Sequence, residues 1–172
     1  MIADRFVALE TTPAGIKARD QATAQTVLLI DVGPLDPRLI GLFHPALIAV
    51  FAVVNHEGRT LAATEFVQGR SLFELFHGEP CHPRRAAEIV AGLADGVAEL
   101  HASGIVHGNI TQRTAILTTK GKARLSLVTA IGGDEIADVN GLKLVLKTIG
   151  GQPSDEANRA QSAAVLAAAL RS

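Results

Sequence analysis

The sequence contains no tryptophan and no tyrosine, and only one cysteine and one methionine. Because Cys81 is the single cysteine, no disulfide can form within the chain, which excludes a disulfide-stapled scaffold and fits a reducing compartment. Phenylalanine is the only aromatic residue and occurs six times. A hydrophobic core therefore has to be built mainly from leucine, isoleucine, valine and alanine side chains.

An excess of charge of either sign is also missing. The chain has 16 lysine and arginine residues against 17 aspartate and glutamate residues, which gives a formal net charge of −1. Short basic groups such as Arg84-Arg85 are typical of a solvated surface. This balance gives no electrostatic indication of nucleic acid as a partner.

Long hydrophobic runs are absent as well. The most apolar stretch, residues 39–54, contains His44 and Pro45 and is too short to cross a bilayer as a helix. The first residues lack the basic start and the apolar run of a signal peptide. We therefore expect a cytoplasmic protein whose chain carries no membrane segment.

The apolar residues that are present suffice for a globular fold. A chain of 172 residues with 48% hydrophobic residues is typical of one domain that buries about 70% of its unfolded surface. Apolar β-rich runs, separated by turn signals such as Pro13-Ala-Gly15 and Asn55-His-Glu-Gly58, predict strands. The predicted strands cover residues 6–9, 16–19, 26–32, 46–54, 60–66, 115–118 and 123–127.

Caps and apolar periodicity predict the helices. Asp36 before Pro37 is a helix start, and Ser71 with Glu74 three residues later is a capping box. Ser154 is a suitable N-cap for an alanine-rich tail helix, whose small side chains would pack on its own domain or on a partner. The predicted helices cover residues 36–42, 83–103, 138–149 and 154–171, with a short helix opening at Ser71.

Strands and helices are segregated along the chain, which predicts an α+β fold. We expect a single domain over residues 1–172. Its first part, residues 1–66, is rich in strands. Its second part, residues 71–172, is mainly helical and ends in the tail helix 154–171.

The most informative motif lies in residues 100–117, which read L-H-A-S-G-I-V-H-G-N-I-T-Q-R-T-A-I-L. The stretch resembles the catalytic loop of protein kinases, H-R-D-L-x-x-x-N, in which the aspartate is the catalytic base and the asparagine binds Mg²⁺. Here His107 and Gly108 open the loop. Asn109 stands at the position of the base, and Thr114 stands at the position of the metal ligand.

Four other segments resemble the same family in the same order. Lys17-Ala-Arg-Asp20 is similar to the end of the second strand of bacterial Ser/Thr kinases. Phe43-His-Pro-Ala-Leu-Ile48 is similar to their L-x-H-P-x-I-V segment. Residues 64–72 resemble the hinge, and residues 138–144 resemble the start of the helix that anchors the catalytic loop. The resemblance spans residues 6–153 and implies a protein kinase-like fold, with a small antiparallel β-lobe and a truncated helical C-lobe.

The groups that carry kinase chemistry are missing from these segments. No lysine occurs between Lys17 and Lys120, so the lysine that holds the ATP phosphates is absent, and Ile30 stands in its place. Residues 31–45 contain no glutamate that would pair with such a lysine. Leu127, followed by Val-Thr, replaces the metal-binding aspartate of D-F-G.

Further losses affect the loops that hold nucleotide and substrate. The glycine-rich loop is reduced to Gly15, and the amide of Asn109 cannot accept a proton at neutral pH. Together these losses remove the electrostatic stabilisation on which phosphoryl transfer depends. We therefore expect a pseudokinase with no enzyme activity, no cofactor and no metal site. The resemblance assigns structural roles to His107, which packs beneath the active site, and to Asp138, which holds amides of the catalytic loop.

Our main hypothesis is a pseudokinase that serves as a protein-interaction or allosteric regulatory module in bacterial signalling. The partner would be a kinase, another signalling protein or a second copy of the chain. An alternative is a metal-independent sensor of a nucleotide or small ligand, which would use the hinge residues Thr64, Glu65 and Val67. A transferase that uses the kinase cleft differently is a further alternative.

One further group of residues could suggest a metal site. His77, Cys81 and His82 lie close together in the sequence, but their spacing matches no standard zinc pattern and no fourth ligand is evident. This spacing favours residues of a surface loop.

Overall fold

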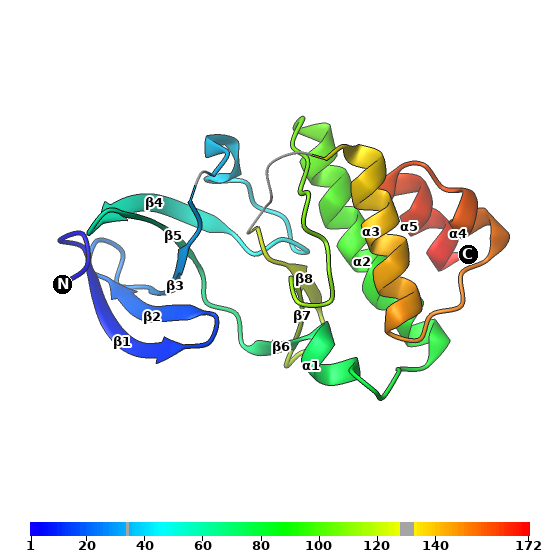
Figure 1. Cartoon of the computed structure of the whole chain (residues 1–172), viewed down its shortest axis with the longest axis horizontal. Coiled ribbons are helices and arrows are strands. Elements are labelled where there is room, and N and C mark those ends of the chain that lie inside the picture. Colours follow the sequence, from blue (N-terminus) through cyan, green and yellow to red (C-terminus); the bar gives the residue numbers. More distant parts are fainter. Residues whose placement is uncertain (34, 128–132) are drawn as a thin grey trace. The chain divides into compact units, whose positions relative to one another are not determined.

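The computed structural model describes residues 1–33, 35–127 and 133–172, and the chain forms two compact units (Figure 1). Unit 1 comprises residues 1–43 and 48–67, and unit 2 comprises residues 44–47 and 68–172. Strands make up unit 1, and helices dominate unit 2. The predicted α+β class is therefore confirmed.

Unit 1 is an antiparallel sheet of five strands in the order β1-β2-β3-β5-β4. One face carries the core of the unit, in which Phe6, Val27 and Leu29 are almost completely buried. The two edge strands are β1 and β4. The strands are β1 (Phe6–Thr12), β2 (Gly15–Asp20), β3 (Thr26–Asp31), β4 (Val50–His56) and β5 (Arg59–Glu65).

Tight turns set the register of this sheet. His56 pairs with Arg59 across a two-residue turn in which Glu57 and Gly58 both have positive φ angles, 51° and 77°. This is the type I′ turn that matches the twist of a hairpin, so the turn predicted from Asn55-His-Glu-Gly58 is present. Gly15 opens β2 because a β-carbon there would lie 2.3 Å from the carbonyl oxygen of Leu29.

Two predictions for unit 1 were wrong in their extent. The helix expected over residues 36–42 is a single 3₁₀ turn, Pro37–Leu39, although Asp36 does cap it through the backbone N–H of Arg38. The turn stops because Ile40 is extended and forms a parallel bridge with Val50. The strand expected over 46–54 begins only at Val50, since residues 44–47 belong to unit 2.

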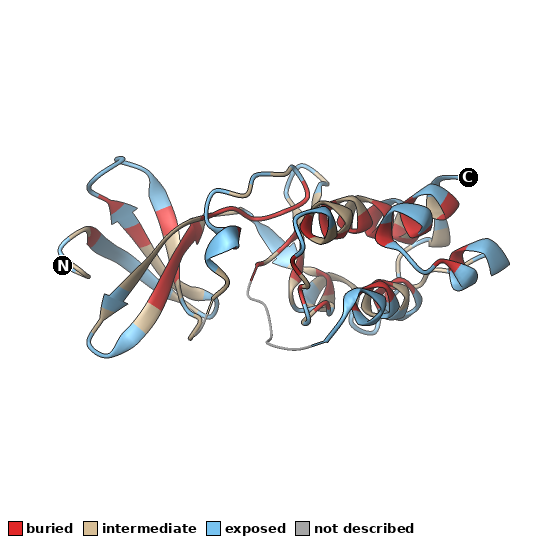
Figure 2. Ribbon diagram, turned by 90° about the horizontal axis from the view of Figure 1, so that it is seen from above, coloured by how far each residue is buried: buried red, intermediate tan, exposed pale blue. Residues whose placement is uncertain are grey.

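Unit 2 is built around α2, which packs against α3 and α5 (Figure 1). Figure 2 shows buried residues along these helices and exposed residues on their outer sides. Leu93, Leu100, Leu142 and Leu166 are fully buried in this core. The helices are α1 (Leu72–Phe76), α2 (Pro83–Ala102), α3 (Glu135–Thr148), α4 (Asp155–Arg159) and α5 (Ala163–Arg171).

The start and the end of α2 follow from its sequence. Pro83 occupies the first turn, where a missing N–H costs nothing, and the Nδ1 atom of His82 accepts a hydrogen bond from Arg84 N. Gly104 follows the helix with a φ of 75°, the left-handed conformation that commonly ends a helix. α3 begins three residues earlier than predicted, because Asp134 caps it through the N–H of Ala137.

A small sheet completes unit 2. It contains β6 (Gly69–Ser71), β7 (Ala115–Thr118) and β8 (Ala123–Leu125) in that order. β6 was not predicted; it is a three-residue strand that pairs with β7. Residues 44–47 join this unit because Leu125 N donates to Ala46 O at 2.7 Å and Leu47 forms a parallel bridge with Leu125.

The tail helix predicted over residues 154–171 is in fact two helices, α4 and α5. Ala160 has an extended ψ of 133°, and Ser162 starts the second helix as N-cap for the N–H of Val165. The ammonium group of Lys143 donates to the carbonyl oxygens of Asn158 and Ala160 at 2.9 and 2.6 Å. This side chain satisfies carbonyl groups at the end of α4, so the break costs little in unpaired backbone.

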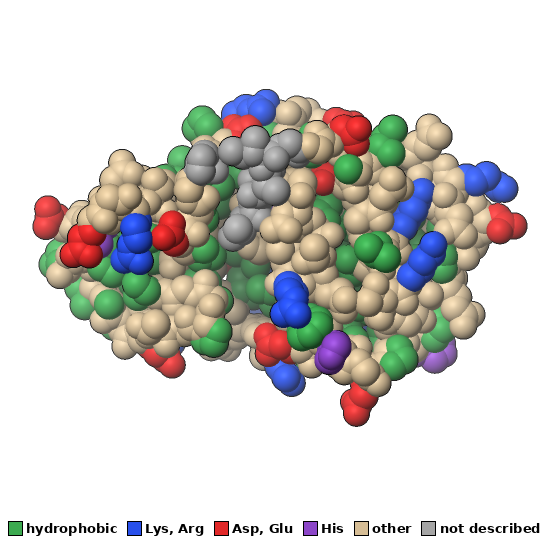
Figure 3. Space-filling model, in the orientation of Figure 1, with side chains coloured by type: hydrophobic (Ala, Val, Ile, Leu, Met, Phe, Trp, Pro, Cys, Tyr) green, Lys and Arg blue, Asp and Glu red, His purple; other side chains and the backbone are tan. Residues whose placement is uncertain are grey.

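Surface features agree with the balanced composition. On the face shown in Figure 3, acidic and basic side chains are interspersed, with no broad field of one sign. Within the part of the chain that the structure describes, every helix is too short or too polar to span a membrane.

Candidate functional site

The segment that resembles a catalytic loop is anchored by the carboxylate of Asp138, in the first turn of α3. Oδ1 accepts from Gly108 N at 2.8 Å, and Oδ2 accepts from His107 N at 2.8 Å. Nε2 of His101 lies 2.9 Å from Oδ2. The residue is 1% exposed, so these partners replace water around a buried charge. The positive end of the α3 dipole favours the carboxylate further.

His107 is held on both sides of its ring. Nδ1 accepts from Asn109 N at 3.1 Å, and Nε2 lies 2.6 Å from Ser126 O. Since a carbonyl oxygen only accepts, these two bonds assign the proton to Nε2 of a neutral imidazole. Burial lowers the pKa of His107 below its ordinary value of 6.5. The neutral ring is therefore fixed in place and links the loop backbone at Asn109 to Ser126.

Thr114 closes the loop at the position where the resemblance places a metal ligand. Its hydroxyl donates to Asn109 O at 2.8 Å and accepts from Thr111 N at 3.0 Å. Gly108 has a φ of 77°, a left-handed conformation that suits glycine. The turn between Asn109 and Thr114 is thus held by a hydroxyl bonded to backbone groups.

The chemistry of these groups is limited. Residues 107–114 contain no aspartate, glutamate, lysine or cysteine. Leu127, at the position of the D-F-G aspartate, is buried and apolar, while Val128 and Thr129 lie outside the described residues. Among the residues that the structure describes, no cluster of three histidine, cysteine or acidic side chains could hold a metal ion.

In unit 1, the positions compared with the phosphate-binding groups are parts of the sheet. Ile30 pairs with Ala62 in the β3–β5 ladder. Gly15 lies in the tight β1–β2 hairpin, where its N–H donates to Thr12 Oγ1 at 3.2 Å. With only Pro13 and Ala14 between the strands, this hairpin has no room for a loop of backbone amides around a phosphate.

The hinge residues make contacts within unit 1. Thr64 is buried, and its hydroxyl donates to Leu28 O at 3.2 Å. Glu65 N donates to Ala49 O at 2.9 Å, and Ala49 N donates to Oε1 of Glu65 at 3.3 Å. Val67 is half-buried and is the last residue of unit 1.

The residues weighed as metal ligands have local roles. His77 ends α1, and its ring lies 4.4 Å from that of Phe73, measured between centroids. His82 caps α2. Cys81 is a free thiol whose pKa is raised by burial.

From the sequence alone, no role is assigned to His101, which lies in the last turn of α2. The structure places it against Asp138, 37 positions later in the chain. A second missed feature is the guanidinium of Arg113, which stacks 3.7 Å above the ring of Phe73. No local pattern signals either contact, because each joins residues of separate elements.

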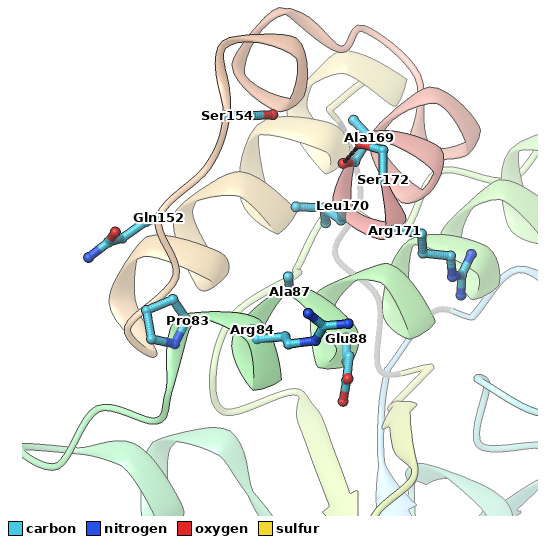
Figure 4. Close-up of a pocket in the computed structure, with 10 residues that line it drawn as sticks. All are labelled: Pro83, Arg84, Ala87, Glu88, Gln152, Ser154, Ala169, Leu170, Arg171 and Ser172. Carbon is cyan, nitrogen blue, oxygen red and sulfur yellow. Dashed lines mark hydrogen bonds between the residues drawn. The ribbon is translucent and has the colours of Figure 1, made fainter.

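Unit 2 also contains an open pocket of about 780 Å³ (Figure 4). It lies between the first turns of α2, which supply Arg84 and Glu88, and the end of α5, which supplies Arg171. Arg171 pairs with Asp95 at 2.5 and 2.9 Å and holds the pKa of that carboxyl below its usual range. No residue of the loop over 107–114 lines this pocket.

Comparison with known proteins finds relatives that are protein kinases. Serine/threonine-protein kinase PkaA of Streptomyces coelicolor is 30% identical over 133 residues, which are 74% of this chain and 24% of that protein. Serine/threonine-protein kinase pkn2 of Myxococcus xanthus is 26% identical over 111 residues, 61% of this chain and 13% of that protein. Serine/threonine-protein kinase PrkC of Bacillus subtilis is 23% identical over 103 residues, which are 58% of this chain and 16% of that protein.

No protein-family model matches the chain. The chain spans less than a quarter of the length of each of these three relatives. The five-stranded antiparallel sheet and the helical second unit of this chain are consistent with kinase relatives. The chain is thus homologous to part of the Ser/Thr protein kinases and has a kinase-like fold.

Proposed function

We propose that this chain is a catalytically inactive kinase-like module, a pseudokinase, that acts through protein interaction or allosteric regulation in signalling. The observation that carries the proposal is the contrast within one loop. The Asp138 carboxylate accepts from the loop amides of His107 and Gly108, and the His107 ring accepts from Asn109 N. The groups that would transfer a phosphate are absent from the same loop.

The two central positions of the loop explain the expected inactivity. A kinase needs a carboxylate to accept the proton of the substrate hydroxyl, and Asn109 offers a neutral amide. It also needs an oxygen ligand for Mg²⁺, and the Thr114 hydroxyl already bonds the backbone at Asn109 and Thr111. These bonds support a structural role of the hydroxyl in holding the loop.

The phosphate side of the reaction lacks support as well. Ile30, an aliphatic residue in the middle of β3, cannot neutralise phosphate charge. The short hairpin at Gly15 supplies no cradle of N–H groups. Because phosphoryl transfer is catalysed almost entirely by positioning and charge stabilisation, losing these groups together removes the basis for catalysis.

We further propose a cytoplasmic, bacterial setting. This part of the proposal is supported by the bacterial relatives and by the single cysteine.

The test is a phosphate-transfer assay with radiolabelled ATP, Mg²⁺ or Mn²⁺ and a mixture of basic protein substrates. We expect no transfer above that of a heat-denatured sample. Transfer that is abolished by Asn109→Ala and retained by Asn158→Ala, which alters an exposed residue of α4, would overturn the proposal. The second variant controls for a contaminating kinase, because contaminant activity would be equal in both preparations.

A thermal-shift titration with ATP, with and without Mg²⁺, accompanies this assay. A ligand present at 100 times its dissociation constant stabilises a protein by about 2.7 kcal/mol, which is readily visible. We expect no shift. A shift in melting temperature that requires metal would contradict the proposal that the chain is inactive. A metal-independent shift that Thr64→Phe removes would favour the alternative, a sensor of a nucleotide or small ligand.

A further inference from the structure

The free edge of β4 is the part of the molecule that the proposed function leaves unexplained. Among the described residues of unit 1, β4 pairs only with β5, and no strand borders its other side beyond Val50 (Figure 1). The outer side of Val50 is occupied, since Val50 O accepts from Gly41 N at 3.1 Å and Ile40 forms a bridge with Val50. The open stretch of the edge therefore runs from Ala52 to His56.

The register shows which backbone groups point outward along this stretch. Thr60 O accepts from Val32 N at 3.1 Å, so Thr60 turns its backbone polar groups toward β3. Its partner across the hairpin, Asn55, must then point its own N–H and C=O away from β5. Val53, which pairs with Ala62, lies two positions before Asn55, so its N–H and C=O also point away from β5. Within the described residues, no backbone hydrogen bond outside the strand ladders involves Val53 or Asn55.

The two edges of the sheet are protected differently. β1 carries a charged residue, Glu10, has a bulge at Leu9 in the middle of the strand, and is followed by Pro13. Charges, bulges and prolines are the devices that keep an edge strand from pairing with another chain. β4 has none of these over residues 52–55, which read A-V-V-N, and its own bulge lies at the end that Ile40 covers.

The open edge is complementary to itself. An antiparallel pair related by a two-fold axis at Val54 would place Val53 opposite Asn55 of a second copy, and Asn55 opposite Val53 of that copy. Each of these pairs exchanges both an N–H and a C=O, so all outward groups of both strands would be bonded, roughly four hydrogen bonds in total. Val54 would lie opposite Val54 of the second copy. Residues 52–55 carry no charge that would repel the same residues of that copy.

We propose that β4 is a self-association edge, through which two copies of the chain pair antiparallel into one continuous sheet. This inference rests on the proposed interaction function and specifies its partner as a second copy of the chain. Exposed apolar side chains beside the strand add to the surface: Ile40 is 40% exposed, and Phe43, 66% exposed, has its ring 6.5 Å from that of Phe51 between centroids. Because the paired stretch is only a few residues long, we expect a weak dimer.

Sedimentation velocity between about 5 and 500 μM chain, without nucleotide, tests the proposal, and hydrogen exchange reports on single amides. We expect a concentration-dependent dimer and slower exchange of the Val53 and Asn55 amides as the dimer forms. Val53→Pro removes an outward N–H without removing a bond to β5, and Asn55→Lys adds a charge to the edge. Each should weaken the dimer about tenfold or more.

Ala8→Lys, which adds the same charge to the exposed β1 edge, is the matched control and should leave the dimer unchanged. A chain that stays monomeric at every concentration, or a dimer that survives both β4 variants, would overturn the inference. Far-UV circular dichroism of Asn55→Lys verifies that this surface variant is folded. Since the phosphate-transfer assay does not depend on dimerisation, failure of this proposal and failure of the proposed function are distinguishable.

Discussion

Replacing Asp138 by asparagine is the sharpest test of how the loop is held. The amide oxygen can still accept from Gly108 N, but the amide nitrogen then faces His107 N, which also donates. A buried backbone N–H without an acceptor costs about 1–3 kcal/mol, and bonds to a carboxylate are stronger than bonds to a neutral amide. We therefore expect Asp138→Asn to lower the free energy of unfolding of unit 2 by about 2–4 kcal/mol.

The assay has a global and a local readout. Because the chain has no tryptophan and no tyrosine, urea unfolding is followed by far-UV circular dichroism, and at a slope of about 2 kcal/mol/M the midpoint should fall by roughly 1–2 M. Hydrogen exchange should show the amides of His107 and Gly108 losing protection. The control is Asp134→Asn, the same substitution at an exposed N-cap of the same helix, where asparagine caps as well as aspartate. Equal stability of the two variants, with unchanged protection of both amides, would refute the reasoning.

Two further predictions concern pH. Arg5 holds the pKa of Asp20 at about 2 against an ordinary 3.8, so this stabilisation, about 2 kcal/mol, is complete above pH 3.8 and is lost as the pH falls toward 2. Asp20→Asn should thus destabilise unit 1 at pH 7 but not near pH 2 in acid-unfolding curves, whereas Asp36→Asn, in an exposed ion pair, should change little. Burial lowers the pKa of His107, so the unfolded chain takes up a proton below about pH 6.5 while the folded chain resists it, and the stability of unit 2 should fall on acidification through that range. His107→Gln should remove this slope in urea titrations at several pH values, and an identical slope in both proteins would contradict the assignment.

Local signals in the sequence predicted most elements of the fold. Ser71 and Ser154 cap helices as expected, because a cap is a bond between residues three positions apart. The hairpin turn at Glu57-Gly58 was predictable because a glycine readily adopts the positive φ that this turn requires. The loop motif over residues 100–117 also indicated kinase-like relatives, because it is a pattern of neighbouring residues.

Element lengths were predicted less well where distant residues decide them. The 3₁₀ turn at Pro37–Leu39 stops because Ile40 bridges to Val50, ten positions later. The tail helix breaks at Ala160, where Lys143 of another helix binds the carbonyl oxygens. Helix propensity alone favours one long alanine-rich helix. The break is possible because the ammonium group of Lys143 donates to the carbonyl oxygens that the break leaves without a helical partner.

The sequence by itself determined the α+β class, the order of the elements and the absence of charged catalytic side chains from the loop, since composition, periodicity and motif positions are local properties. Only the tertiary structure decided that His101 lies against Asp138, that the Thr114 hydroxyl closes the loop, and that no described strand of unit 1 borders the outer side of β4 beyond Val50. These features depend on which distant backbone and side-chain groups meet. A single sequence does not encode such pairings in any pattern of neighbouring residues.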